Sequence, residues 1–452
     1  MYRQQQLDDL LANRRILIAG YGREGKSTHA LIEQYVPSAV VTIAANDDEI
    51  FRCLDESKNN PYDLIIKSPG IPTMKLEGLC NPETITSQTD LFLQIYGDQT
   101  IAVTGTKGKS TTTTLIFHVL KTSFADTRKV ILAGNMGIPL FDILPQIDHD
   151  TVVVAEFSCH QLENIHRSPH IGIILNLYQE HLDHYHSYLD YQMAKMQMML
   201  RQQPGDHCFY CTDSPDLNLL AKELSPKVCS TLHPYSLDQA LHSDIATLPT
   251  SLQGNHNLSN IYVACQATQL LGIQPQQFAQ ALATFHGLPH RLELVGTFHG
   301  ITFYNDSIST IPEATIAAVE ALKNVDTLIL GGFDRHIDYG KLGTFLVQSP
   351  AGKQIRNLVL IGEAGQSMYD SWKPMSPSPL SDKNILFENH YPTLIAWCLA
   401  HTAAGSICLL SPAAASYDNF KNFEHRGDTY KEEILRQSQT LNLQQLISSQ
   451  QQ

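Results

Sequence analysis

The chain lacks most features of an exported, membrane-bound or nucleic-acid-binding protein. No apolar run reaches the about 18 residues that a membrane-spanning helix needs, and the first residues lack the basic and apolar segments of a secretory signal. The nine cysteines are odd in number, and without an export signal we expect them to be reduced thiols. The net charge is −14 with no basic run, which argues against nucleic-acid binding. These absences predict a cytoplasmic protein.

The composition and length indicate several packed domains. Hydrophobic residues make up 43% of the chain and charged residues 17%, which suits folded domains and argues against disorder. At about 150 residues per domain, 452 residues predict about three. Short apolar runs alternate with helical stretches, which predicts parallel sheets with helical crossovers. New α/β units begin near residues 97 and 290.

The strongest motif is the loop Thr104–Thr111, with the sequence TGTKGKST. It follows a strand-like segment and precedes a run that can form a helix, so its amides and the helix N-terminus would attract phosphate oxygens. Lys109 would contact the outer phosphates, and Ser110 or Thr111 would bind Mg²⁺. The loop departs from the common P-loop, because two residues instead of four separate its first glycine from the Gly-Lys pair. The alternative is a lysine-bearing turn without a ligand, which the order of strand, glycines, lysine and hydroxyl residues disfavours.

A second glycine pattern, Gly20-x-Gly22-x-x-Gly25, follows the first apolar run. It is typical of dinucleotide-binding turns, but alone it is about equally consistent with a structural turn. Asn46 and Asp47 lie roughly 20 residues further on, where a ribose-binding acid would stand. The turn could therefore hold the diphosphate of NAD or of a UDP-sugar.

Metal-ligand residue types follow two further strands. Glu156 ends the segment TVVVAE, and a carboxylate at the carboxyl end of a strand faces the ligand crevice of an α/β sheet, which suits Mg²⁺. The segment 181–186 (HLDHYH) has the composition of a metal site, but with 20 histidines in the chain chance clustering is a real alternative. Cys208 and Cys211 form a lone CxxC without the second pair that zinc sites usually need, and we expect two thiols of one strand.

Together these motifs resemble the Mur ligases, the ATP-dependent amino-acid-adding enzymes of peptidoglycan synthesis. The resemblance covers almost the whole chain, and the TGTKGKSTT loop is quite specific for the family. The other segments that carry it are AGNMGIPL (133–140), EFSCHQLE (156–163), LNLYQEHLDHY (175–185), YQMAK (191–195), GNHNLSN (254–260), GLPHRLE (287–293) and YNDS (304–307). The segments SPGI (68–71) and LLSPAAASYDNFKNFEHRGD (409–428) are most similar to the member that adds glutamate to UDP-N-acetylmuramoyl-L-alanine.

The resemblance implies an α/β fold of three Rossmann-like domains. Residues 1–97 would bind the UDP-sugar, residues 98–290 would form a central P-loop-type ATPase domain with a mostly parallel sheet, and residues 291–452 would bind the amino acid. The implied reaction is ATP-dependent ligation of glutamate, with D-glutamate favoured, to UDP-N-acetylmuramoyl-L-alanine through an acyl phosphate. We expect a monomer that acts on small molecules.

The resemblance also implies roles for individual residues. The expected catalytic residues are Lys109, Glu156, His181 and Lys195. Two Mg²⁺ ions are expected, held by Ser110, Glu156, His181 and Lys195, the last as a carbamate formed with CO₂. The expected ATP-binding residues are Gly105, Thr106, Lys107, Gly108, Lys109, Ser110, Thr111, Asn257, Asn260, Arg291 and Asp306. The expected UDP-sugar-binding residues are Gly22, Arg23, Glu24, Gly25, Asn46, Asp47, Ser68, Pro69, Gly70 and Asn135. The expected amino-acid-binding residues are Arg335, Ser416, Tyr417 and Phe423.

Two positions depart from the glutamate-adding pattern. Ile308 stands where that member has a basic residue, and Arg335 stands where it has a lysine. An arginine can still bind a carboxylate through two hydrogen bonds. These changes leave the ligase chemistry intact, but they make L-glutamate a serious alternative to D-glutamate.

Three other functions are alternatives. A nicotinamide-dependent dehydrogenase would explain only the first glycine turn, and NADH oxidation without ATP use would identify it. A folate-type polyglutamate ligase shares the central loop but lacks the N-terminal glycine unit. A non-catalytic nucleotide-binding partner subunit would keep the loop and show no ADP release.

Overall fold

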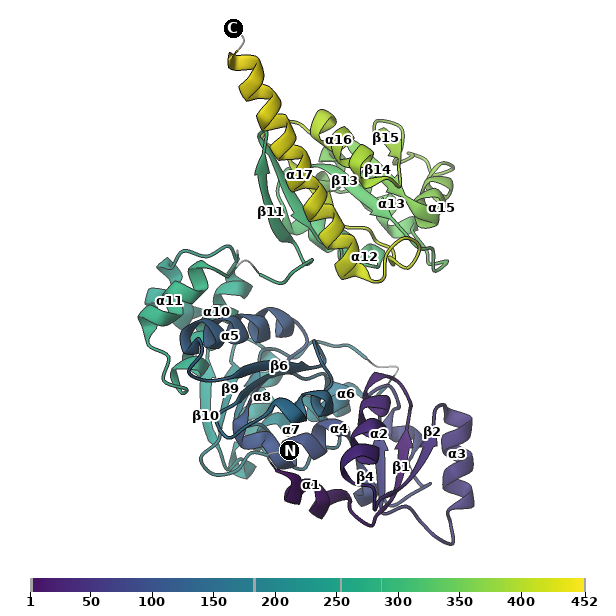
Figure 1. Cartoon of the computed structure of the whole chain (residues 1–452), viewed down its shortest axis with the longest axis vertical. Helices are drawn as coiled ribbons and strands as arrows, with labels where there is room; N and C mark the ends of the chain where they lie inside the picture. Colours follow the sequence, from purple (N-terminus) through teal and green to yellow (C-terminus); the bar gives the residue numbers. More distant parts are fainter. Residues whose placement is uncertain (1–2, 182–183, 253, 286, 451–452) are drawn as a thin grey trace. The chain divides into compact units, whose positions relative to one another are not determined.

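The computed structural model describes residues 3–450 except 182–183, 253 and 286. The chain divides into two compact units, Met1–Phe285 and His286–Gln452. Figure 1 shows that each unit is built from β-sheet with helices packed on it.

The first sheet has four parallel strands in the order β2-β1-β3-β4. The strands are β1 (Arg15–Ala19), β2 (Val40–Ala44), β3 (Leu64–Lys67) and β4 (Ile85–Thr86), and the helices are α1 (Gln4–Leu11), α2 (Arg23–Tyr35), α3 (Asp47–Glu56) and α4 (Gln88–Tyr96). Side-chain caps fix where two of these helices begin. The Asn46 side chain accepts a hydrogen bond from the amide of Glu49 in α3, and Ser87 accepts one from the amide of Asp90 in α4.

The second sheet has six parallel strands in the order β10-β9-β8-β5-β7-β6. The strands are β5 (Thr100–Thr104), β6 (Val130–Gly134), β7 (Val152–Glu156), β8 (Ile171–Ile174), β9 (His207–Cys211) and β10 (Thr231–Tyr235). The helices are α5 (Lys109–Phe124), α6 (Cys159–Leu162), α7 (Tyr188–Leu200), α8 (Pro215–Leu224), α9 (Leu237–Leu241), α10 (Asn255–Gln269) and α11 (Pro275–Ala283). Strand order reverses around β5, so ligands of such a sheet are expected beyond the carboxyl ends of β5 and its neighbours.

One hydrophobic core joins the first and second sheets. Ile16 and Ile66 of the first sheet belong to the same buried cluster as Ile101 and Val153 of the second. Helix α4 is part of this cluster and buries most of its residues. The shared core explains why the first two sheets form one compact unit. The predicted boundary at residue 97 therefore separates two sheets that pack together, and the division into three domains stays a prediction.

The third sheet forms the second unit, with six strands in the order β11-β12-β16-β13-β14-β15. Only β11 runs antiparallel to its neighbour. The strands are β11 (Glu293–Phe298), β12 (Ile301–Asn305), β13 (Val325–Gly331), β14 (Asn357–Ile361), β15 (Asn384–Phe387) and β16 (Ile407–Leu410). The helices are α12 (Pro312–Ala321), α13 (Gly340–Gln348), α14 (Pro350–Gln354), α15 (Gly362–Trp372), α16 (Tyr391–His401) and α17 (Phe423–Gln450). The long helix α17 packs on α16 and β12 (Figure 1).

Two predictions from composition can be compared with the structure. All nine cysteines are free thiols, as expected, and Cys208 and Cys211 lie buried on one strand, β9. Within the described residues, no helix has both the length and the hydropathy that crossing a membrane requires.

Candidate active site

The lysine-bearing loop connects β5 to α5, and its glycines are required by its shape. Gly105 has φ +146° and Gly108 has φ +86°, which is backbone that other residues rarely adopt. A Cβ on Gly108 would lie 3.0 Å from the side-chain oxygen of Asn260. The loop thus packs tightly against α10, and this contact brings the predicted residue Asn260 to the loop.

Asn176, which we did not predict as a site residue, holds the loop in place. Its side-chain oxygen accepts hydrogen bonds from the amides of Thr106 (3.1 Å) and Lys107 (2.8 Å), and its amide donates to the Lys107 carbonyl (3.0 Å). Asn176 follows β8 at the same sheet edge as the loop. Its position after an apolar run was the only signal that sequence alone provided.

Two lysines converge on the same loop. Lys109 Nζ donates to the Thr106 carbonyl (3.0 Å), and burial lowers the pKa of Lys109. Lys195 comes from α7, is 2% exposed, and its Nζ donates to the Gly105 carbonyl (2.9 Å). Burial lowers the pKa of Lys195 to about 8. Both side chains lie close to where phosphates would contact the loop.

Glu156 ends β7 beside the loop, and only one of its two carboxylate oxygens has a hydrogen-bond partner among the described residues. Its Oε1 accepts a hydrogen bond from Asn135 Nδ2 (2.6 Å). Its Oε2 is buried and has no hydrogen-bond partner among the described residues. Because a buried carboxylate oxygen without a partner is costly, this atom fits a metal ion. Ser110 is the second residue of α5 and is half-buried.

His181 lies in the segment that follows β8, with a positive φ of +58°. Its ring is 4.8 Å from that of His160, and its Nε2 is 3.9 Å from a carboxylate oxygen of Glu180. Glu180 also pairs with Lys107 of the loop at 2.6 Å. Residues 182 and 183 of the predicted HLDHYH cluster lie outside the described residues. The structure thus brings His181, the loop and β7 to one side of the second sheet.

His184 of the same cluster is held by a buried ion-pair network. His184 Nε2 and Glu163 Oε1 are 2.8 Å apart, and Lys67 Nζ donates to Glu163 Oε2 at 2.8 Å. Despite burial, these partners lower the pKa of Glu163 to about 2. Lys67 ends β3, so the network links the first sheet to the segment that carries His181.

The glycine turn of the first sheet is closely packed. Gly20 has φ +92°, and a Cβ on Gly25 would lie 2.1 Å from the Gly20 carbonyl oxygen. Ser68 donates to the same carbonyl (2.8 Å). The predicted residue Glu24 accepts a hydrogen bond from Gln161 of α6 (2.8 Å), and burial raises the pKa of Glu24.

The other predicted UDP-sugar residues belong to the first sheet and its connections, except Asn135, which follows β6 of the second sheet. Gly22, Arg23, Gly70 and Asn135 are exposed, and Pro69 is half-buried. Asn46 caps α3, and Asp47 pairs with Lys75.

The predicted ATP-binding residues fall in both units. Asn257 and Asn260 belong to α10 in the first unit, whereas Arg291 and Asp306 belong to the second. Asp306 is 2% exposed and accepts hydrogen bonds from the Leu292 amide (3.1 Å) and the Ser411 hydroxyl (2.7 Å). Burial raises the pKa of Asp306 to about 6. Arg291 is exposed and lies in the turn that Asp306 holds.

Three of the four predicted amino-acid residues lie on two neighbouring loops of the second unit, and the fourth, Phe423, begins α17. Arg335 donates to the Thr310 carbonyl (2.8 Å), which places it beside the segment that contains Ile308. Ser416 is buried and Tyr417 is exposed, and the Tyr417 ring lies 6.4 Å from that of Phe333. The Phe333 amide donates to the Ala415 carbonyl (2.9 Å), which joins the two loops.

Comparison with known proteins supports the assignment of a family. The model of the Mur ligase middle domain matches residues 103–268. A protein from Desulfitobacterium hafniense (strain Y51) named UDP-N-acetylmuramoylalanine--D-glutamate ligase is 33% identical over 394 residues, covering 83% of this chain and 84% of that protein. This chain belongs to the Mur ligase family.

Two further comparisons extend along the length of this Mur ligase. A relative from Oenococcus oeni that has the same name is 30% identical, covering 93% of this chain and 97% of that protein. The crystal structure of MurF from Acinetobacter baumannii has a TM-score of 0.57 at 14% identity, covering 96% of this chain and 99% of that one. The predicted fold class, α/β with mostly parallel sheets, is confirmed.

Arg426 of this Mur ligase is a second residue that sequence reasoning missed. It is fully buried in α17. Its guanidinium donates to Ser307 Oγ (2.9 Å) and to the carbonyls of Ser307 (2.8 Å), Ala414 (3.1 Å) and Ala415 (3.0 Å). Ser307 Oγ donates in turn to the Phe423 carbonyl (2.8 Å). Arg426 therefore ties the segments around Asp306, Ser416 and Phe423 together, although it stands inside a motif of the sequence without a predicted role.

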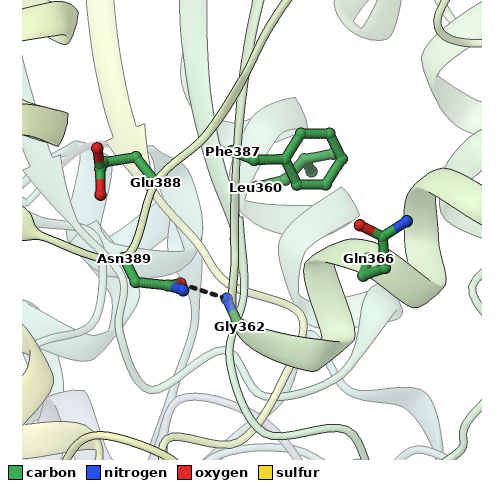
Figure 2. A pocket seen from close by; sticks show the side chains of 6 residues that line it. All are labelled: Leu360, Gly362, Gln366, Phe387, Glu388 and Asn389. Carbon is green, nitrogen blue, oxygen red and sulfur yellow. Dashed lines mark hydrogen bonds between the residues drawn. The ribbon is translucent and has the colours of Figure 1, made fainter.

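A cavity of about 280 Å³ opens at the carboxyl ends of β14 and β15. Figure 2 shows that the Asn389 side chain points to the amide of Gly362, from which its oxygen accepts a hydrogen bond (2.7 Å). Leu360, Gln366, Phe387 and Glu388 complete the lining (Figure 2). The Glu388 carboxylate would repel the side chain of glutamate. We therefore do not place the amino acid in this cavity.

Proposed function

We propose that this Mur ligase joins glutamate, with D-glutamate favoured, to UDP-N-acetylmuramoyl-L-alanine while ATP is converted to ADP and phosphate. The relatives from Desulfitobacterium hafniense and Oenococcus oeni are named for this pair of substrates, with D-glutamate as the amino acid. The observation that carries the proposal is that Lys109 and Lys195 both donate to carbonyls of one glycine loop, while Glu156 ends β7, the strand paired with β5 that leads into the loop. The reaction would serve peptidoglycan synthesis.

The proposed chemistry has two steps. The terminal carboxylate of the alanine attacks the γ-phosphorus of ATP, and ADP leaves with the electron pair of the broken P–O bond. The amine of glutamate then attacks the acyl phosphate, phosphate leaves, and the amine loses a proton. Phosphoryl transfer depends mainly on positioning and charge stabilisation. Loop amides from Gly105 to Thr111 and the Lys109 ammonium group would supply both.

The metal-binding part of the proposal rests on the donor set. Ser110, Glu156 and His181 would hold Mg²⁺, and the buried Glu156 Oε2 without a partner fits that role. Mg²⁺, when bound, would neutralise charge on the phosphate oxygens. Asn135 would hold the other oxygen of Glu156 and so orient the carboxylate.

Lys195 is proposed to carry a carbamate. Its pKa of about 8 leaves a usable fraction of neutral amine at neutral pH. The neutral amine would attack CO₂, form an N–C bond and release one proton, which turns a cation into a carboxylate. Oxygen ligands from this group would suit a second Mg²⁺. In the described structure, the amine occupies a buried position beside the loop, where a cation would repel a metal ion.

The remaining substrates would bind at the other predicted residues. The turn Gly22–Gly25, with Asn46, Asp47 and Ser68–Gly70, would hold the UDP-sugar. Asn257, Asn260, Arg291 and Asp306 would contact ATP. Arg335, Ser416, Tyr417 and Phe423 would contact glutamate. We further propose that the enzyme acts as a monomer in the cytoplasm.

The decisive experiment is ADP release with UDP-N-acetylmuramoyl-L-alanine and a panel of single amino acids. We expect release with one glutamate enantiomer only, and a loss of roughly 10²-fold or more in Lys109→Ala. Lys121→Ala, at an exposed position on the same helix, is the matched control and should keep its rate. Release with another amino acid but neither glutamate would overturn the substrate, and no release with any would overturn the ligase assignment.

One specific observation favours L-glutamate as the second candidate. Ile308 removes a basic residue, whereas Arg335 contacts the same segment through Thr310. A pocket that loses one cation and gains a guanidinium fork can hold the side-chain carboxylate in a different orientation. Because buried hydrogen-bonding sites can discriminate between substrates by about 10⁴-fold, we expect one glutamate enantiomer to be ligated much faster than the other.

A further inference from the structure

Three potential soft-metal ligands meet beside the candidate active site. Cys159 and His160 begin α6, just after β7, and His181 follows β8. One possible ligand atom from each residue lies within 4.8 Å of the other two. Cys159 is a free thiol with 1% exposure, so its sulfur faces the interior.

His160 is held in a position where one ring nitrogen has no partner. Its ring stacks on that of His184 at a centroid distance of 3.9 Å and meets that of His181 edge-on at 4.8 Å. His160 Nε2 is buried and makes no hydrogen bond to the described residues. His184 is already engaged by Glu163. His160 Nε2 is therefore the better candidate for a metal ligand, because it is buried without a partner, whereas His184 Nε2 already contacts Glu163.

The donor set selects a class of metal. Thiolate sulfur and imidazole nitrogen are ligands of Zn²⁺ and similar cations, whereas Mg²⁺ prefers oxygen. With Zn–S near 2.3 Å and Zn–N near 2.1 Å, tetrahedral ligands stand roughly 3.5 Å apart. Small side-chain rotations would therefore close the cluster around an ion. Three protein ligands would leave a fourth position open to water or to a phosphate oxygen.

We propose that Cys159, His160 and His181 form a binding site for a thiophilic divalent cation of the Zn²⁺ type, and that its occupation inhibits the Mg²⁺-dependent reaction. Inhibition follows because His181 is shared between this site and the proposed Mg²⁺ site. Binding needs only the three side chains, whereas the inhibition rests on the proposed function.

Metal binding is tested on the full-length, reduced and metal-stripped chain. Co²⁺ is the spectroscopic probe, and Zn²⁺ affinity is measured in competition with a chromogenic chelator. We expect one equivalent of Co²⁺ to give a thiolate-to-cobalt charge-transfer band in the near ultraviolet. Cys159→Ser should remove the band, and Cys159→Ser and His160→Phe should each weaken Zn²⁺ binding by at least about 10²-fold, because even outer-shell partners of a metal can be worth that much.

Two variants control for nonspecific effects. His186→Phe removes an exposed histidine of the same segment, and Cys211→Ser removes a buried thiol on β9. Both should keep the band and the affinity. Absence of the band in the wild type, or its retention in Cys159→Ser, would overturn the site. In His160→Phe the aromatic ring keeps its stack on His184, so loss of binding reports the nitrogen and not the fold.

Inhibition is tested by ADP release at fixed Mg²⁺ with increasing Zn²⁺. We expect Zn²⁺ to inhibit the wild type and His160→Phe to need at least about 10-fold more Zn²⁺ for the same inhibition. Binding without any effect of Zn²⁺ on ADP release would overturn the competition. A chain that shows the cobalt band but forms no ADP under any condition would refute the proposed function and leave the metal site standing.

Discussion

Lys109 and Lys195 show how one loop can place two identical side chains in environments that differ in burial. Both donate to loop carbonyls, and burial lowers the pKa of both. Lys109 starts α5 and remains partly accessible, which suits a cation that meets phosphates. Lys195 is almost fully buried, which favours its neutral form. Burial therefore makes Lys195 a better nucleophile than Lys109 for the reaction with CO₂, because more of it is in the neutral form.

The first prediction concerns the pH dependence of this amine. With a folded pKa of about 8, well below the ordinary lysine value, the neutral fraction rises from about one tenth at pH 7 to about nine tenths at pH 9. After CO₂ is stripped, reactivation at a fixed concentration of dissolved CO₂ should thus be roughly 10-fold faster at pH 9 than at pH 7. ADP release after mixing measures the rate.

Two lysine variants test whether Lys195 is the source of the CO₂ and pH dependence. Lys195→Ala should be inactive and partly restored by a small added carboxylate, whereas Lys222→Ala, at an exposed position on α8, should behave as the wild type. Activity that never depends on CO₂, or an active Lys195→Ala, would refute the carbamate.

Sequence reasoning at this scale succeeded where spacing carried the signal. The loop of Lys109 could be predicted to follow a strand, because glycine, lysine and hydroxyl residues stand in a recognisable order. Asn176 and Arg426 could not be predicted, because each acts through hydrogen bonds to backbone groups distant in sequence. No local pattern specifies such partners.

At the scale of elements, a buried network joins the first sheet to the segment that carries His181. Lys67 from β3, Glu163 after α6 and His184 are each at most 8% exposed in their side chains. Removing one member of such a group leaves an uncompensated buried charge. The network therefore couples the packing of β3 to the position of a candidate metal ligand.

We predict that Lys67→Met lowers the free energy of unfolding of the first unit by about 3–5 kcal/mol. Urea denaturation followed by hydrogen exchange of the β1 and β3 amides measures it. Lys58→Met, which removes an exposed lysine paired with Asp55, should cost less than about 1 kcal/mol. Equal effects of the two variants would contradict the role of burial.

The pH dependence of the network has a definite sign. The folded-state pKa of Glu163, about 2, lies below the ordinary value of 4.5, so the carboxylate stabilises the fold above pH 4.5. This contribution is lost as the pH falls from about 4.5 to about 2. In Glu163→Gln that part of the acid sensitivity should disappear.

Arg426 organises the second unit in a comparable way. We predict that Arg426→Met lowers the free energy of unfolding of this unit by about 3 kcal/mol or more, because several buried carbonyls lose a charged donor. The only two tryptophans of the chain, Trp372 and Trp397, belong to this unit, so their fluorescence reports it selectively. Arg436→Met, which removes an exposed arginine paired with Glu433, is the control and should leave the tryptophan-detected urea midpoint nearly unchanged, because solvent screens an exposed ion pair. An unchanged tryptophan signal in Arg426→Met would refute the prediction.

The order of the elements was largely predictable, whereas their grouping was not. Apolar runs such as those of β5, β7 and β13 are buried on both faces, which makes them visible in the sequence. The shared core gathers residues of both sheets, such as Ile66 and Ile101, into one buried cluster, and no periodicity in the sequence identifies such distant partners. Sequence reasoning therefore predicts three α/β units, and this division stays a prediction, whereas the core shared by the first two sheets could not be predicted.

At the scale of the whole molecule, the residues predicted to contact ATP are divided in sequence between the two units. The phosphate-binding loop, Asn257 and Asn260 belong to Met1–Phe285, and Arg291 and Asp306 belong to His286–Gln452. Each unit has its own hydrophobic core. Folding and nucleotide binding should therefore respond differently when the chain is divided between the units.

The last prediction separates these two properties. Residues 286–452 expressed alone should fold, with a tryptophan-detected urea midpoint close to that in the full chain, because their cores are internal to this unit. Residues 1–285 alone should also fold and keep the loop, since Asn176, Lys195 and Glu156 all belong to this fragment. This fragment should nevertheless bind ATP at least about 10-fold more weakly than the full chain, by the loss of Arg291 and Asp306. Calorimetric titration with ATP and Mg²⁺ measures both affinities. Equal affinity of the fragment and the full chain would exclude Arg291 and Asp306 from the ATP site and leave the loop, Asn257 and Asn260 as its predicted determinants.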